Sequence, residues 1–386
     1  MKRIIALLNL SLLFYYPLYS QDENSYIDEL SNISPEAIKI VDEYSATSFD
    51  QDTGAVIIFR ESKVVVRDNK IDTITYHIIG KILDERARDD YSQIPIAFNS
   101  YYEDMKLDFA RSINEDKTFI NILEDAIQFK TPPEYMGSNT YTDTKILAFS
   151  IPALTINKYF EYQISITTKK PVVENHWFNT FYFNHRLRKL SDPYFIRIDP
   201  VKTSRFIVNV KRGNNFRFEI SKAELEETKV VNEEFESYTW VMNNLKPIVF
   251  EAYMPYLFEN LPSITVSSIE NWNEFAEWAY STLGTRVKVT NDILSKAVEL
   301  TSDSKSKIES IKKIYDYVRS EIDYIQADLD RGGLTPHYSD EILRTKYGDC
   351  KDQVILMLSM LEAVGIDGYP ALLSSYSFRN HQNYLP

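Results

Sequence analysis

The chain has 386 residues, 44% hydrophobic and 26% charged, which excludes a globally disordered protein and allows two or three domains. Its formal net charge of −13 argues against nucleic acid or an anionic membrane as the main partner, because an acidic surface repels phosphate groups. The 27 Tyr and 21 Phe against only 10 Gly favour β-structure.

The N-terminus predicts a secretory signal peptide over residues 1–20. Lys2 and Arg3 form the charged start, residues 4–18 are mostly apolar, and small Ser20 precedes the expected cleavage point. The alternative is a membrane anchor, but the apolar stretch is shorter than the roughly 20 residues of a spanning helix. We therefore expect an exported protein, periplasmic or associated with the cell envelope, without stable membrane insertion.

A polar segment, 21–51, is expected to hold one short helix near 36–44 and leads into a β-rich domain expected over 52–268. Two subdomains with a break near residue 200 are the alternative organisation of this domain. Apolar and polar residues alternate there in short runs between polar turns, as in an antiparallel sandwich. The expected strands include 55–59, 63–67, 74–82, 105–109, 160–166 and 206–210. Residues 247–262, with three prolines, predict an extended connector.

The third expected domain, 269–386, begins as a helical region. Three amphipathic helices are predicted around 272–279, 293–300 and 308–322. A fourth is expected over 350–364, with Val354, Leu358 and Leu361 on its buried face, and a strand follows over 369–375. The overall fold class is therefore α+β.

Cys350 is the single cysteine, so it forms no intramolecular disulfide. Two readings remain open for it, a buried apolar side chain and a nucleophile. Asp349 is a good helix N-cap, which places the thiol in the first turn, where the helix dipole favours a thiolate. Gly348 allows a tight turn that brings backbone N–H groups near a developing oxyanion.

Residues 347–370, YGDCKDQVILMLSMLEAVGIDGYP, resemble the nucleophile helix of the transglutaminase-like (papain-like) superfamily. The likeness extends upstream through residues 323–325, the glycine pair 332–333 and Pro336. The resemblance implies a cysteine-catalysis core with Cys350 as nucleophile.

The region 52–200 resembles a β-rich domain of unknown function that precedes this core in exported bacterial proteins. Residues 271–278 look like the family's tryptophan-containing first helix. Asn157 replaces a glycine of the family's turn, and asparagine tolerates the left-handed conformation.

In this superfamily the general-base His and its orienting Asp lie on strands after the cysteine helix. His381 is the one histidine after Cys350 and a weak candidate for the base, since we expect it in a loop, with no acidic residue after it. Gln326 is a weak candidate for an oxyanion donor. We expect the sequence to stop before the triad is complete, and the chain as given to be nearly inactive.

The other histidines have no expected catalytic role, although we expect His337, in the loop after Pro336, to lie at the border of the cleft. These are His77, His176, His185 and His337.

The leading functional hypothesis is thiol-dependent acyl transfer or hydrolysis on peptide or carboxamide bonds through Cys350. The alternative is a non-catalytic periplasmic binding or scaffold protein with a β-rich recognition domain. One Cys and five His without ligand spacing argue against a metal site, and no cofactor motif is present. The expected substrate or partner is a protein or peptide.

Overall fold

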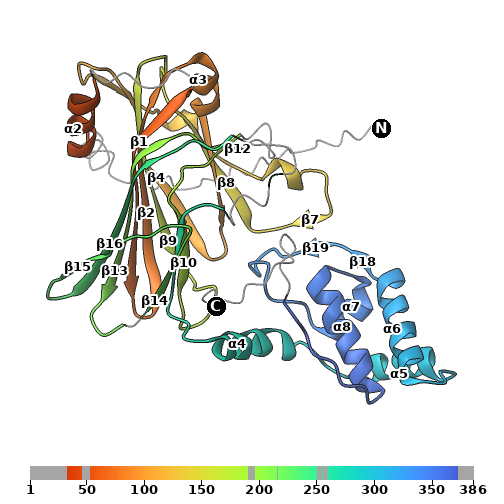
Figure 1. Cartoon of the computed structure of the whole chain (residues 1–386). Helices are drawn as coiled ribbons and strands as arrows, with labels where there is room; N and C mark the ends of the chain where they lie inside the picture. The colour runs from red at the N-terminus through yellow and green to blue at the C-terminus, as the bar shows by residue number, and fades with distance from the viewer. Residues whose placement is uncertain are drawn as a thin grey trace, which may run out of the picture.

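The computed structural model describes residues 33–45, 53–189, 196–214, 216–249, 254 and 260–372. The proposed signal peptide, most of the connector and His381 lie outside these ranges. Of the strand expected over 369–375, residues 369–372 are described and do not form a strand, and the rest lies outside the described residues. The described part forms a β-rich lobe and a helical lobe, and helix α4 (Trp272–Gly284) runs between them (Figure 1).

An eight-stranded sheet forms the body of the β-rich lobe, in the order β15-β16-β13-β1-β2-β9-β4-β5. Its strands are β1 (Ala55–Arg67), β2 (Lys70–Ile82), β4 (Glu103–Ile113), β5 (Phe119–Asn121), β9 (Tyr159–Thr168), β13 (Val201–Lys211), β15 (Thr228–Val231) and β16 (Phe235–Leu245). All neighbours are antiparallel except β1 and β13, which run parallel. That pair joins segments far apart in the chain, which a local alternation pattern does not reveal.

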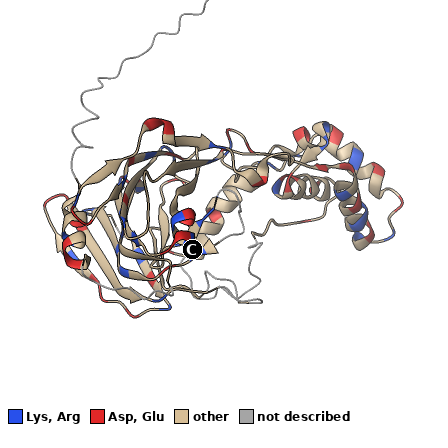
Figure 2. Ribbon diagram, turned by 90° about the horizontal axis from the view of Figure 1, so that it is seen from above, with Lys and Arg blue, Asp and Glu red and all other residues tan. Residues whose placement is uncertain are grey.

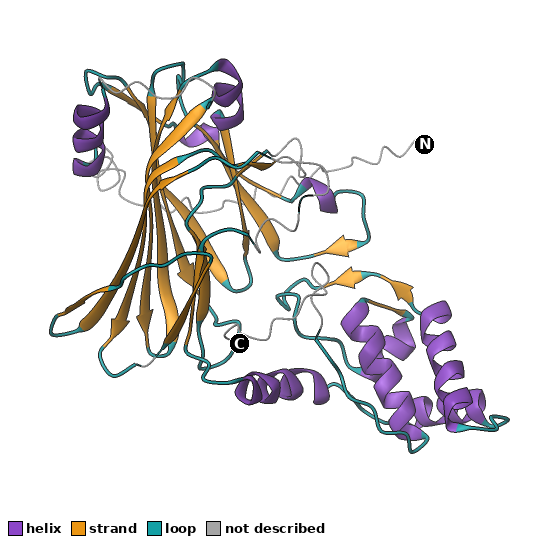
Figure 3. Ribbon diagram, in the orientation of Figure 1, coloured by secondary structure: helices purple, strands orange, loops and turns teal. Residues whose placement is uncertain are grey.

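Two three-stranded sheets lie beside the large sheet and complete the layers of the lobe (Figure 3). One contains β10 (Phe178–Tyr182), β17 (Ser263–Ser267) and β14 (Arg217–Ser221), and the other contains β3 (Gln93–Asn99), β8 (Thr144–Ser150) and β6 (Ile127–Lys130). Side chains from these sheets share one hydrophobic core with the large sheet. The α+β class, with a sandwich-like β-rich region before the helices, is therefore confirmed.

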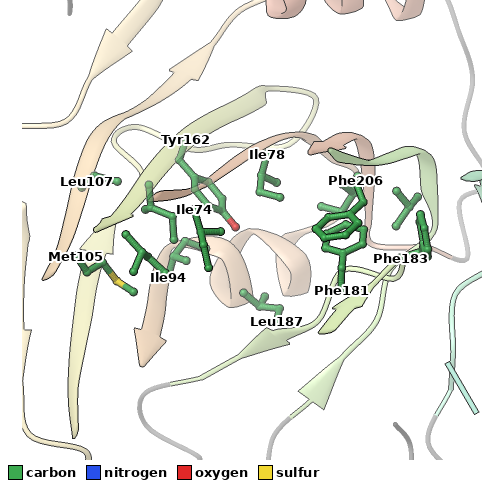
Figure 4. Packing of buried hydrophobic residues seen from close by; sticks show 14 of the residues in the cluster. Ile74, Ile78, Ile94, Met105, Leu107, Tyr162, Phe181, Phe183, Leu187 and Phe206 are labelled. Carbon is green, nitrogen blue, oxygen red and sulfur yellow. The ribbon is translucent and has the colours of Figure 1, made fainter. Parts of the chain in front are cut away.

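The shared core follows the alternation in the sequence. The side chains of β9 at positions 160, 162, 164 and 166 all point inward, and so do those of β13 at 206, 208 and 210. In Figure 4, Tyr162 and Ile78 of the large sheet lie between the layers with Phe181 of β10. Phe181 stacks on Phe206, with ring centroids 4.9 Å apart.

Two strands differ from the sequence prediction. The runs 55–59 and 63–67 are one strand, because β1 pairs with β2 and β13 through the intervening residues. In β4 a bulge lies between Leu107 and Phe109, so Met105 and Leu107 are buried in the shared core but Phe109 turns to the other face. There its ring lies 4.4 Å from the Arg111 guanidinium.

Short elements complete the β-rich lobe. Helix α2 (Pro35–Tyr44) packs on the outer face of the large sheet, and its bounds match the helix expected near 36–44. The other elements are α3 (Glu85–Tyr91), the 3₁₀ turns η1 (Glu124–Ala126) and η2 (Pro133–Tyr135), the pair β11 (Leu187–Arg188) and β12 (Ile196–Arg197), and β7 (Thr140–Tyr141). Asn157 adopts φ 68°, the left-handed conformation that a glycine would also supply.

The helical lobe contains α5 (Asn291–Thr301), α6 (Lys307–Glu321), α7 (Ser339–Thr345) and α8 (Cys350–Ala363) around a second core. Helix α7 adds to the three helices predicted before the cysteine. The predicted buried face of α8 is partly wrong. Leu361 is buried, but Val354 is exposed and Leu358 half-buried, because α5, α6 and α7 contact the side that carries Ile355, Leu356 and Met360.

Acidic and basic residues alternate along the ribbons of the helices (Figure 2). Within the described residues, no helix is long and apolar enough to cross a membrane.

Candidate functional site

Helix α8 begins at Cys350 because the residues around the cysteine satisfy the free N–H groups of its first turn. Asp349 has extended backbone (φ −92°), and its Oδ1 accepts N–H bonds from Lys351 at 3.1 Å and Asp352 at 3.3 Å. In return, Asp352 Oδ2 accepts the Asp349 N–H at 3.1 Å. This capping box fixes the start of the helix and the position of the cysteine.

Gly348 precedes the cap in the short strand β20 (Tyr347–Gly348), where it is buried. A Cβ atom there would lie 2.5 Å from the Cβ of Asp352, closer than any ordinary contact. The glycine is therefore required for close packing of the strand on the helix start, rather than for a left-handed turn.

Cys350 is exposed, so the buried-filler reading of this cysteine is wrong. Strand β18 (Asp323–Tyr324) pairs in parallel with β20 and brings Tyr324 to the helix start. Tyr324 lies close enough to Cys350 for the cysteine to affect the ionisation of the phenol. Burial raises the pKa of Tyr324, and so does the neighbouring Cys350.

A charged cluster lies behind the first turn of α8. Lys351 Nζ binds Asp328 Oδ1 at 2.7 Å and also pairs with Asp349. Burial opposes the Lys351 charge, but hydrogen bonds to these two carboxylates outweigh it and raise the pKa of Lys351. Burial also raises the pKa of Asp349 despite the contact with Lys351. Because two carboxylates already hold Lys351, its charge is balanced within the cluster.

Asp352 joins α8 to the loop before α7. Its Oδ1 accepts the backbone N–H of His337 at 2.7 Å, and its Oδ2 lies 3.1 Å from Nδ1 of the same residue. Burial favours a neutral carboxyl, but the bonds from His337 outweigh it and lower the pKa of Asp352. Although the sequence suggested that His337 borders the cleft, His337 is buried and its imidazole binds this carboxylate.

Gln326 lies in β19 (Gln326–Ala327), two residues after Tyr324. Its Nε2 donates to Asp328 Oδ2 at 2.7 Å, which leaves one N–H of the amide for another acceptor. Gln326 therefore belongs to the polar cluster behind Cys350.

The remaining histidines of the described chain lie in the β-rich lobe. His77 Nε2 is 2.8 Å from Glu161, and His176 is 3.8 Å from Glu274 at the start of α4. His185 is buried between the layers.

The β-rich lobe reaches the site through β7, which pairs in parallel with β19 (Figure 3). Just after β7, the carboxylate of Asp143 accepts backbone N–H bonds from Asp330 and Gly332, each at 3.2 Å. Asn99 donates to the Gly332 carbonyl at 3.3 Å. The loop that follows β19 is therefore held by both lobes.

Sequence reasoning missed Tyr324 and Asp328 as members of the site. Residues 323–325 were noted only for their family likeness, and nothing local marks Asp328, because its partner Lys351 is far along the chain. Among the described residues, no group of three or more His, Cys, Asp and Glu side chains is arranged to hold a metal ion.

Comparison with known families gives two matches. Residues 69–249 match DUF3857, a domain of unknown function with a solved structure, and residues 295–368 match the transglutaminase-like superfamily. No curated protein matches the chain.

Among solved structures, the chain is similar to one described as a proposed protease from Parabacteroides distasonis, with a TM-score of 0.63 and 18% identity. The match covers 81% of this chain and 59% of that protein, so this chain spans well under two thirds of it. An M1 zinc metallopeptidase from Deinococcus radiodurans matches with a TM-score of 0.25 and 8% identity, over 55% of this chain and 42% of that one. The match to the Parabacteroides distasonis structure supports the fold. The match to the metallopeptidase is too weak to support a conclusion.

Proposed function

We propose that this chain, a transglutaminase-like protein that carries a DUF3857 domain before its helical core, uses Cys350 as a nucleophile on peptide or carboxamide bonds. The observation that carries the proposal is the exposed thiol at the first residue of α8, behind a complete capping box. A helix N-terminus stabilises a thiolate, and exposure lets a substrate reach it.

In the proposed reaction the thiolate attacks the carbonyl carbon, and the C–N bond breaks to leave a thioester on Cys350. The leaving amine takes a proton from a general acid. Water then hydrolyses the thioester, or a second amine accepts the acyl group. His381 is the sequence candidate for the acid and base and lies outside the described residues.

The backbone N–H of Cys350 is the candidate oxyanion donor, and it lies next to the Tyr324 side chain. A substrate carbonyl oxygen would accept this N–H. The second N–H of Gln326 is a candidate for a further donor. Tyr324 therefore borders the exposed thiol on the side of β18.

The test measures hydroxamate formation from carboxamide peptides in the presence of hydroxylamine, which captures a thioester. The assay uses the protein isolated from its own cells, because the low activity expected above applies to the 386 residues alone. We expect product from that protein and none from its Cys350→Ala variant. Tyr324→Phe should raise the rate of Cys350 alkylation by iodoacetamide several-fold, whereas Tyr315→Phe, on the exposed side of α6, should not. Equal product from native protein and Cys350→Ala would refute the proposal.

The alternative is a non-catalytic binding or scaffold protein. One observation favours it: within the described chain, the side chain next to Cys350 is a tyrosine, and His337 binds Asp352 instead. The same assay separates the two functions. The binding protein is supported if the native protein forms no hydroxamate and the Cys350→Ala variant still binds the same partner proteins as the native protein.

We also propose that the protein is exported, since residues 1–20 have the charged and apolar parts of a signal peptide. The intact mass of the protein from the cell envelope tests this. A mature chain that starts at Gln21 supports export, and a chain that retains Met1 contradicts it.

A further inference from the structure

A cavity of about 360 Å³ lies inside the β-rich lobe, far in sequence from Cys350. Its walls come from β1, β2, β3, β9 and β10 and from the segment after β10. Most of the lining is apolar, and Ile78, Ile164 and Phe181 are typical of it. Figure 4 shows Ile78 and Phe181 facing this space together with Tyr162.

Arg60 of β1 brings a positive charge into this apolar space. Its Nη1 donates to the Tyr182 carbonyl at 2.7 Å and lies 3.5 Å from Ser204 Oγ, and its guanidinium lies 4.1 Å from the centre of the Phe181 ring. Its Nε has no hydrogen-bond partner. Among the residues that the structure describes, no carboxylate pairs with Arg60.

Two further polar groups on the cavity wall are also unsatisfied. Asn184 is 4% exposed and its Oδ1 has no partner, and His185 is 7% exposed and its Nε2 has none. Buried polar atoms are almost always hydrogen-bonded, so three unpaired groups around one cavity are unusual.

The pKa values of the basic side chains on the cavity wall also favour a bound anion. Burial lowers the pKa of Arg60 to about 10, which still leaves the guanidinium charged at neutral pH. Burial, and next the charge of Arg60, lower the pKa of His185 to about 3, so its imidazole is neutral. Arg186 lines the cavity as well, and the charge of Arg60 has no carboxylate partner among the described residues, which is costly in an apolar interior.

We propose that this cavity is a binding site for a small organic anion with an apolar body, whose carboxylate pairs with Arg60. The Arg60 guanidinium matches one negative charge, and the aliphatic and aromatic walls bury the rest of the ligand. The volume lies at the lower end of the range of small-molecule sites. Asn184 and His185 offer polar contacts that fix the orientation of the ligand.

Inorganic phosphate fits this site less well, because it has no apolar part to cover the lining. Sites for highly charged anions also gather several donors or cations around them. The competing explanation is that water fills the cavity and that the Phe181 ring and the Tyr182 carbonyl alone stabilise the charge of Arg60.

The test is isothermal titration of the full chain with decanoate, with decanol and inorganic phosphate as comparison probes. We expect saturable one-to-one binding of decanoate that is at least tenfold tighter than binding of decanol. Arg60→Met should weaken decanoate at least tenfold. Arg67→Met, a change at an exposed position of the same strand, should leave it within twofold.

Asn184→Asp provides a second variant that keeps Arg60. A carboxylate on the wall of the cavity should compensate the guanidinium, so we expect weaker decanoate binding and an unchanged or higher melting temperature. If Arg60→Met does not fold, Ile96→Trp, which fills the cavity from β3, should abolish binding instead. Absence of decanoate binding, equal binding of decanol, or full binding by the variants would overturn the proposal.

Discussion

Replacement of Asp352 by alanine should loosen the start of α8. The carboxylate accepts three hydrogen bonds, from the backbone N–H groups of Asp349 and His337 and from the His337 imidazole. Alanine leaves these donors buried without an acceptor. Each unsatisfied buried donor costs about 1–3 kcal/mol. At the low end of that range the three donors, one of which is the capping-box N–H, together give an expected loss of about 3–5 kcal/mol in the stability of this lobe.

Hydrogen exchange followed by mass spectrometry is the suitable assay, because it reports the two lobes separately. A loss of about 3 kcal/mol corresponds to roughly hundredfold faster exchange, since each tenfold step is about 1.4 kcal/mol. We expect that change in peptides of α8 and none in peptides of β9. Asp340→Ala, an exposed acidic position in the first turn of α7, is the matched control. Exchange of α8 within threefold of the native rate would refute the reasoning.

The Asp352 carboxylate should also make the stability of the protein depend on pH. The pKa of Asp352 is lower in the folded protein than in an unfolded chain, because the hydrogen bonds from His337 favour the charged form. Its contribution to stability is therefore present above an unfolded value of about 4 and is lost as the pH falls through the folded value. Asp352→Asn removes this titration, so the stability difference between native protein and variant should shrink as the pH falls below about 4. A difference that stays constant or grows on acidification would contradict this assignment.

Three further substitutions test other parts of the structure. Gly348→Ala should cost about 1–3 kcal/mol through overpacking, whereas Gly284→Ala, next to the exposed Tyr280 ring, should be neutral by thermal unfolding. Asp143→Asn should speed hydrogen exchange in residues 326–333 about tenfold, because the amide offers one acceptor oxygen where the carboxylate offers two. Unchanged exchange would show that the pairing of β7 with β19 is enough to hold the loop. Glu161→Gln should destabilise the β-rich lobe by about 3 kcal/mol, because it removes the negative charge that lies 3.4 Å from the buried Arg111 guanidinium. A melting temperature within about 2 °C of native would disprove this.

Local sequence determined a large part of this protein. The strand alternation at 160–166 and 206–210 gave the buried faces of β9 and β13, because side chains two apart in a strand share a face. Asp349, Cys350 and Asp352 lie within four residues of one another, so the helix start that they form depends on hydrogen bonds within one turn.

The failures of sequence reasoning share one cause. The bulge in β4 depends on its pairing with β9, and the buried face of α8 depends on which helices contact it. A hydrophobic pattern shows which positions are apolar, but it does not show which helices or strands pack against them. Val354 is apolar yet exposed, since α5, α6 and α7 pack on the other side of the helix.

The sequence by itself therefore determined the α+β class, the strand-rich region before the helices, and the helix that begins at the single cysteine. The tertiary structure alone decided which groups meet at that cysteine and in the cavity. Tyr324 reaches Cys350 only through the pairing of β18 with β20, and Arg60 faces His185 only because strands distant in the chain form opposite layers. Such contacts close long loops of chain, and no pattern within a few residues specifies them.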